Sequence, residues 1–292
     1  MKNKFPNDVK LPYFAYGLFK PNEPAHNQIS EFVENISESM SISNSHLWIR
    51  DGLPIINLQS GRQVVGYELK FREEKFEDAY NAISNFVSLG DLRLYEWDVL
   101  NLGDNEGKSY KRMNVLTWHK VPEIPADNIS EEWSAKNDPM FTDAMKIIKE
   151  KTDKYAQEVF AGKPFEWDRF FELQMAYLLL WTAIERYCSF TYGPFLSSGK
   201  KRQALAVSKS FQDALKKVLK ESNHFQRVCF IHDSKDLKKW KELNAHKPIS
   251  SIDYYYIVRC NLAHRGKSEF SDGEIIRHSL IELFNIFQSV LK

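Results

Sequence analysis

The stretch FFELQMAYLLLWTAIERYCSFTYG, residues 170–193, decides the fold of the second half of the chain. Its large apolar residues recur every three or four positions, which places their side chains on one face of an α-helix. Its longest apolar run, AYLLLWTAI, is far shorter than the roughly 18 residues that a membrane-spanning helix needs. The stretch therefore predicts a long helix in a soluble protein without a membrane partner, with this buried stripe: Phe170, Leu173, Tyr177, Leu180, Trp181, Ile184 and Tyr187.

Three further segments of the second half have the same helical spacing. They are SKSFQDALKKVLKES at 208–222, SSIDYYYIVRCNLAHRGK at 250–267 and DGEIIRHSLIELFNIFQSVLK at 272–292. Because apolar stripes on several neighbouring helices must be buried against one another, this pattern predicts an all-α helical bundle over residues 165–292.

The first half has shorter apolar segments that end at turns. RQVVGYELKF at 62–71 alternates apolar and polar residues, as a half-buried strand does. Strands are also predicted at 92–102 and 109–121, joined by the turn GDNEG. We therefore expect an α+β domain at residues 1–121, with a small mixed or antiparallel, barrel-like sheet. Residues 122–164 contain several prolines and then a helical pattern, and are expected to be a linker with a connecting helix.

The net charge of +1 is unevenly distributed along the chain. Residues 163–292 carry 21 basic and 14 acidic residues, a balance of +7, which leaves −6 for residues 1–162. A basic C-terminal half favours a polyanionic partner such as RNA, although a solvated lysine-rich surface has the same balance.

Cysteine usage and the first residues indicate where the protein works. The three cysteines form no CxxC pair, and the opening MKNKFPNDVK is too polar for a signal peptide. We therefore expect reduced thiols, a cytoplasmic location, no zinc or other metal site and no cofactor.

The segment PYFAYGLFKPNEPAHNQI at 12–29 places Tyr16, Gly17 and Leu18 directly after an apolar strand. Backbone N–H groups of such a loop can hold an anion, and glycine allows the ligand to approach closely. Together with VVGYELKF and the closing hairpin, the segment resembles the gamma-glutamylcyclotransferase-like family over roughly residues 11–121. The resemblance implies that fold, and a small anionic ligand at Tyr16, Gly17 and Leu18.

Two positions depart from the pattern of that family. Its enzymes carry a catalytic glutamate at the end of a helix, and the matching position here is Val87, which cannot accept a proton. Leu18 stands where the family has serine or threonine. We therefore expect a degenerate module without cyclotransferase activity, which either senses a ligand or serves as a scaffold or docking surface.

An arginine followed five positions later by a histidine occurs twice, and the pattern alone is weak. The first match, Arg259 and His264, lies in the helical segment YYYIVRCNLAHRGK, with Gly266 closely following. This segment resembles the motif helix of the HEPN superfamily (higher eukaryotes and prokaryotes nucleotide-binding). With the long first helix and the final helix, the resemblance covers roughly residues 165–292.

The second arginine–histidine match has a different sequence context, and the first match departs from the family pattern at one position. RVCFIH, which ends in His232, lies in an apolar run and is interpreted as core through Val228, Phe230 and Ile231. In the first match, the polar residue that usually follows the arginine is replaced by Cys260, and Asn261 is expected to take over its hydrogen bonding.

The resemblance implies an endoribonuclease whose site is shared between two protomers. RNA carries its own nucleophile, the 2′-OH, so cleavage needs a group that moves protons and a cation that stabilises the phosphate. His264 suits the first role because the ordinary histidine pKa is near 6.5, and Arg259 suits the second because arginine stays charged. Positions five apart on a helix point about 140° from each other, which suits a composite site. Asn261 and His264 share a face.

We therefore predict a metal-independent endoribonuclease of HEPN type that acts as a homodimer on RNA. Its candidate catalytic residues are Arg259, His264 and Asn261, and its N-terminal domain would sense a ligand or dock a partner. Family analogy places it in stress response or antiviral defence. One alternative is a non-catalytic protein that binds nucleotide or RNA or dimerises, and another is an active gamma-glutamyl cyclotransferase, which would release 5-oxoproline.

Overall fold

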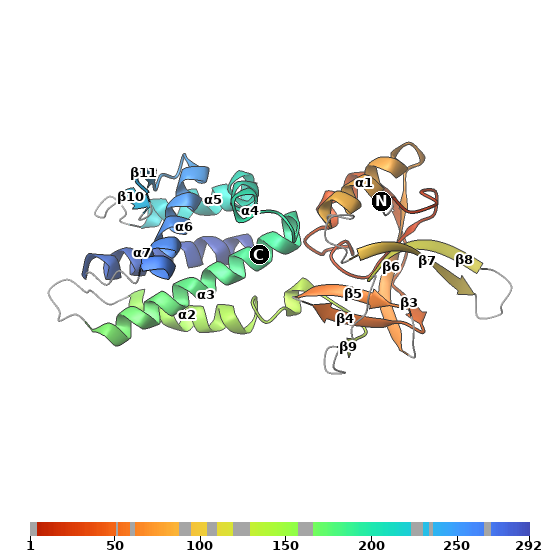
Figure 1. The fold of residues 1–292 in the computed structure, drawn as a ribbon, viewed down its shortest axis with the longest axis horizontal. Helices are drawn as coiled ribbons and strands as arrows, with labels where there is room; N and C mark the ends of the chain where they lie inside the picture. The colour runs from red at the N-terminus through yellow and green to blue at the C-terminus, as the bar shows by residue number, and fades with distance from the viewer. Residues whose placement is uncertain are drawn as a thin grey trace. The chain divides into compact units, whose positions relative to one another are not determined.

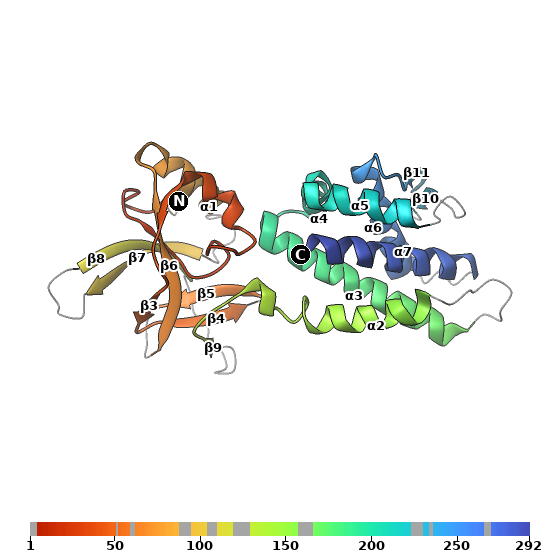
Figure 2. The same cartoon turned by 180° about the vertical axis from the view of Figure 1, so that it is seen from behind.

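The fold comes from a computed structural model, which describes residues 5–50, 52–58, 62–87, 95–103, 110–118, 129–156, 166–222, 230–233, 236–265 and 270–292 (Figures 1 and 2). The chain divides into two compact units. The first comprises Met1–Asp138 and Ser189–Phe195, and the second comprises Pro139–Cys188 and Leu196–Lys292.

The first unit is built on a nine-stranded mixed sheet. Strand β8 pairs antiparallel with β7 and parallel with β1 and β5, which lie one after the other along it. The strands are β1 (Tyr13–Ala15), β2 (Val33–Ile36), β3 (Met40–Ser43), β4 (His46–Arg50), β5 (Leu53–Asn57), β6 (Gln63–Phe71), β7 (Tyr95–Gly103), β8 (Tyr110–Trp118) and β9 (Ile129–Ser130).

The sheet is open within the described residues, so the expected barrel-like closure is absent there. The strand order runs β2-β6-β1-β8-β5-β4-β9, with β3 on β6 and β7 on β8. Closure would require the end strands β2 and β9 to pair, and β9 is only two residues long. Short end strands are a common way to limit exposed backbone hydrogen-bonding groups at a sheet edge.

One helix of the first unit, α1 (Phe76–Phe86), is tied to the sheet through a buried tyrosine. The Tyr80 hydroxyl donates to the Leu11 carbonyl oxygen at 2.6 Å, and its ring meets those of Phe71 and Trp97 edge-on. Burial raises the pKa of Tyr80, so the hydroxyl stays protonated and keeps donating. Among the described residues, 3₁₀ turns lie at His26–Gln28, Ser30–Phe32, Glu73–Lys75 and Ala135–Asn137.

The second unit is mainly helical, as the periodicity of the sequence predicts. In Figures 1 and 2, α2, α3 and α7 run side by side along this unit. No helix in the described part of the chain is long and apolar enough to cross a membrane. The helices are α2 (Asp143–Ala156), α3 (Trp167–Tyr192), α4 (Ser198–Val207), α5 (Lys209–Glu221), α6 (Pro248–Arg265) and α7 (Phe270–Val290).

The second unit is nevertheless not all-α, because it contains an antiparallel pair of strands, β10 (Phe230–Asp233) and β11 (Asp236–Glu242). The sequence interpretation placed Phe230 in the core, whereas its side chain is 50% exposed. Burial alternates along β10 with a period of two, so that only one face of the strand is packed. An apolar run of this length does not by itself distinguish a buried segment from a half-exposed strand.

A cluster of charged groups holds α2 against α3. One carboxylate oxygen of Glu172 accepts hydrogen bonds from Lys151 at 2.9 Å, Lys154 at 2.9 Å and the Tyr155 hydroxyl at 2.8 Å. The hydrogen bonds from Lys154, Lys151 and Tyr155 lower the pKa of Glu172 to about 2. The two helices are therefore joined by an interaction that requires the ionised carboxylate.

Glu172→Gln is expected to remove a pH-dependent part of the stability. Because the folded-state pKa is depressed below the ordinary value of about 4.3, the stabilisation is present above that value and is lost as the pH falls toward 2. With the Glu172 side chain 31% exposed, we expect about 1 kcal/mol near neutral pH. Urea unfolding of both proteins across this range should show their difference vanish in acid. A difference that stays constant with pH would contradict this role of the carboxylate.

Candidate functional site

The predicted ligand loop begins where β1 ends, and its tyrosine has a structural role. The Tyr16 hydroxyl donates to the Leu116 carbonyl oxygen at 2.7 Å and accepts from the Ile56 backbone N–H at 3.3 Å. Burial raises the pKa of Tyr16 well above its ordinary value. The side chain therefore bridges β5 and β8 as a neutral phenol. A Cβ atom on Gly17 would lie 2.4 Å from Cγ of Pro54, so close backbone approach requires glycine there.

A small cavity lies at this loop, and Val87 is part of its wall. The cavity volume is about 20 Å³, roughly the room that one water molecule needs. Its wall contains phenols and apolar groups but no carboxylate, lysine or arginine among the described residues, so it offers no proton acceptor and no cation for an anionic ligand. The lining residues are Tyr13, Tyr16, Gly17, Leu18, Phe19, Pro54, Val87, Tyr95 and Leu116.

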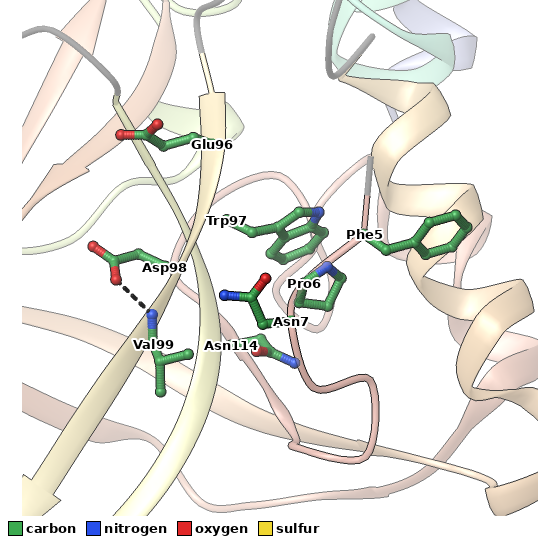
Figure 3. A pocket seen from close by; sticks show the side chains of 8 residues that line it. All are labelled: Phe5, Pro6, Asn7, Glu96, Trp97, Asp98, Val99 and Asn114. Carbon is green, nitrogen blue, oxygen red and sulfur yellow. Dashed lines mark hydrogen bonds between the residues drawn. The ribbon is translucent and has the colours of Figure 1, made fainter. Parts of the chain in front are cut away.

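A larger pocket of about 230 Å³ lies between residues 5–7 and the outer edge of β7 (Figure 3). In Figure 3 the side chains of Glu96 and Asp98 point away from Trp97, so the carboxylates do not face the ring. The Asp98 carboxylate instead accepts from the Val99 backbone N–H at 2.7 Å. This acceptor satisfies a backbone N–H of β7.

Asn114 forms the floor of this pocket and was missed by the sequence reasoning. It is fully buried, and its amide nitrogen donates to the Asp8 carbonyl oxygen at 2.8 Å and to the Tyr80 hydroxyl at 2.9 Å. Its Oδ1 accepts no hydrogen bond within the described part of the chain. The available signal was a polar residue inside the apolar strand MNVLTW, since buried amides are retained where they have partners.

A third, charged pocket of about 220 Å³ lies on β6 and β8. Glu68 is 3% exposed and pairs with Lys111 through one carboxylate oxygen, while the other oxygen has no partner within the described residues. Lys70, Asn35 and Ser37 complete the lining. The ion pair with Lys111 therefore compensates the buried negative charge of Glu68, as buried charges in folded proteins generally need.

In the second unit, Arg259 is a half-buried residue of α6. Its guanidinium carbon is 5.9 Å from the centre of the Tyr256 ring, one turn earlier on the same face. Within the described residues, no carboxylate pairs with Arg259. A guanidinium that carries full charge and has no acidic partner is suited to bind a phosphate oxygen.

A second arginine lies over the same ring, and a lysine is linked to it through Asp253. The guanidinium carbon of Arg202, on α4, stacks 3.6 Å from the centre of the same Tyr256 ring. Asp253 on α6 accepts from Arg202 at 3.0 Å and pairs with Lys241 of β11 at 3.1 Å. We call Arg202, Lys241 and Arg259, with Asp253 and Tyr256, the α6 cationic surface. Three positive charges against one negative charge give this surface a net charge of +2.

Of the predicted catalytic residues, Arg259 and Asn261 have described side chains and His264 does not. Asn261 donates through its amide nitrogen to the His232 carbonyl oxygen at 3.2 Å, so its side chain connects α6 to β10. His264 belongs to α6, but its side chain lies outside the described residues, as do Gly266 and Arg227. The contact brings His232, from the second of the two Arg/His matches, next to the helix that carries the first.

The described residues contain no group of three or more histidine, cysteine, aspartate or glutamate side chains that could hold a metal ion. No protein-family model matches the chain, and no curated protein matches it.

Two solved structures are similar to part of the chain. One is the crystal structure of an AIG2-like protein from Mus musculus, at 16% identity and a TM-score of 0.34, covering 44% of this chain and 90% of that one. The other is a solution structure from Arabidopsis thaliana, at 15% identity and a TM-score of 0.30, covering 53% of this chain and 95% of that one.

Proposed function

We propose that the second unit binds RNA at the α6 cationic surface. The observation that carries the proposal is Arg259, which lies beside Tyr256 without a carboxylate partner in the described part of the chain. An arginine fork can grip two oxygens of one phosphate, and Arg202 and Lys241 add positive charge nearby. The balance of +7 over residues 163–292 attracts a polyanion to this half of the chain.

The finer proposal is that the bound RNA is cleaved without a metal by a homodimer. His264, five positions after Arg259 on α6, would move the protons of the 2′-OH and the leaving oxygen, and Arg259 would stabilise the phosphate in the transition state. Two α6 helices meeting in a dimer would bring the arginine of one protomer to the histidine of the other. The first unit would sense a ligand or dock a partner, in stress response or antiviral defence.

Arg259→Ala is expected to weaken the binding of labelled single-stranded RNA about tenfold or more, because a hydrogen bond to a charged group is lost. The salt dependence should change as well. Each phosphate contact on a single strand contributes about 0.7 to the slope of log affinity against log salt, so the slope should fall by about that amount. Fluorescence anisotropy at several salt concentrations measures both quantities.

Arg169→Ala is the matched control, because it removes the same charge from α3, where Arg169 pairs with Glu166 at 2.6 Å. It should leave the affinity and the slope near those of the wild type. Equal losses in the two variants would mean that only net charge matters, and would remove Arg259 as a specific contact. Binding without cleavage by the wild type would select the non-catalytic alternative.

A further inference from the structure

The β10–β11 pair presents one face to α6 and the other to solvent. The register pairs Phe230 with Glu242 and His232 with Trp240, so these four side chains share a face. Phe230 is 50% exposed and Trp240 is 53% exposed. Their ring centres are 5.2 Å apart with the planes at 64° to each other. Two large aromatic side chains thus lie together on the outer face of the strands.

The opposite side of the strands is fixed to α6 by several polar contacts. Lys241 pairs with Asp253, and the Asn261 amide donates to the His232 carbonyl oxygen. The Ser250 hydroxyl donates to the Glu242 carbonyl oxygen at 2.8 Å and accepts from the Glu242 N–H at 3.0 Å. Since both strands are held at these points, the position of the Phe230–Trp240 pair relative to α6 is fixed. Little conformational entropy would be lost when a ligand binds it.

The chemistry around the pair favours one kind of occupant. Lys238 is an exposed residue of β11, two positions before Trp240. Lys241 pairs with Asp253 of α6, and Arg202 and Arg259 carry positive charge beside Tyr256 of the same helix. Exposed aromatic rings interleaved with cations are the arrangement by which proteins hold single-stranded nucleic acid: the bases stack on the rings and the phosphates meet the cations. Bases of a duplex are already stacked on one another and are not available to the rings.

We propose that Phe230 and Trp240 form a stacking platform for the bases of single-stranded RNA, whose phosphates contact Arg259 and Arg202. This inference rests on the proposed binding of RNA and adds its strandedness and a second binding element. It also gives RVCFIH, whose last three residues lie in β10, a role in substrate binding.

The test is anisotropy of labelled polyuridine with the full-length protein. Trp240→Ala is expected to weaken binding about 5- to 150-fold, the loss usual for one base–aromatic stack. Trp240→Phe should restore most of the affinity. Because no phosphate contact is removed, the salt slope of Trp240→Ala should stay at the wild-type value, unlike that of Arg259→Ala. A duplex of the same length should compete poorly.

Trp167→Ala is the control, because Trp167 is 49% exposed on α3 of the same unit. Wild-type affinity in Trp240→Ala, with binding lost in Arg259→Ala, would overturn the platform and leave the proposed function standing. No RNA binding by the wild type would overturn both. If Trp240→Ala instead changes the sedimentation of the RNA-free protein and not its affinity, the pair is a protein interface and the platform is wrong.

Discussion

Replacing Arg277 with alanine is expected to lower the free energy of unfolding of the second unit by about 3 kcal/mol. Arg277 of α7 is 8% exposed, and its Nε and Nη2 donate to one oxygen of Glu274 at 3.1 and 2.9 Å. Its Nη1 donates to the Tyr155 carbonyl oxygen at 3.3 Å, near the end of α2. Removing the guanidinium takes one hydrogen bond from that carbonyl and two from the Glu274 carboxylate. A cavity also forms between α2 and α7.

Urea unfolding followed by far-ultraviolet circular dichroism measures the change. The slope of the free energy of unfolding against urea concentration should be the same in the variant and the wild type. Arg169→Ala is again a close control, because Glu166 and Arg169 have the same spacing of three on a helix as Glu274 and Arg277. The Arg169 side chain is 30% exposed, against 10% for Arg277, so its loss should cost less than about 1 kcal/mol. Similar losses in the two variants would show that burial does not govern the contribution of Arg277.

The helices of the second unit were predictable because their burial follows a local period. Six of the seven stripe residues predicted on α3 are at most 3% exposed, among them Phe170, Tyr177 and Trp181. The strand segments of the first unit and the helical C-terminal region follow from the same kind of reasoning. Spacing along the chain is enough for these features, since each depends on residues a few positions apart.

The β10–β11 pair was not predictable in this way, and neither were the contacts that depend on it. Phe230 is a residue type that is usually buried, but the solvent exposure of a side chain depends on which other elements pack against it. The Asn261 amide, for example, donates to a carbonyl oxygen 29 positions away. Asn114 likewise meets Asp8, which is 106 positions away. Such partners are set by the tertiary fold and not by sequence spacing.

His264→Ala is expected to reduce RNA cleavage by roughly 100- to 10,000-fold, the usual contribution of one general acid–base group. Cleavage of labelled single-stranded RNA would be followed in EDTA across the pH range near the ordinary histidine pKa of about 6.5. Wild-type cleavage should depend on pH in this range, and the residual activity of the variant should lose that dependence. RNA affinity should change little, because phosphate binding is assigned to Arg259 and not to the imidazole.

Substitutions of two other histidines in the same unit test whether the effect is specific to His264. His246 is exposed before α6, and His246→Ala should cleave as the wild type does. His232→Ala is the more demanding comparison, because His232 contacts α6 through Asn261 and belongs to the competing Arg/His pair. On the platform proposal, its loss should affect affinity more than the cleavage rate at saturating RNA. If His232→Ala abolishes cleavage at saturation while His264→Ala does not, the proton-transferring group lies on β10, and the motif on α6 was chosen wrongly.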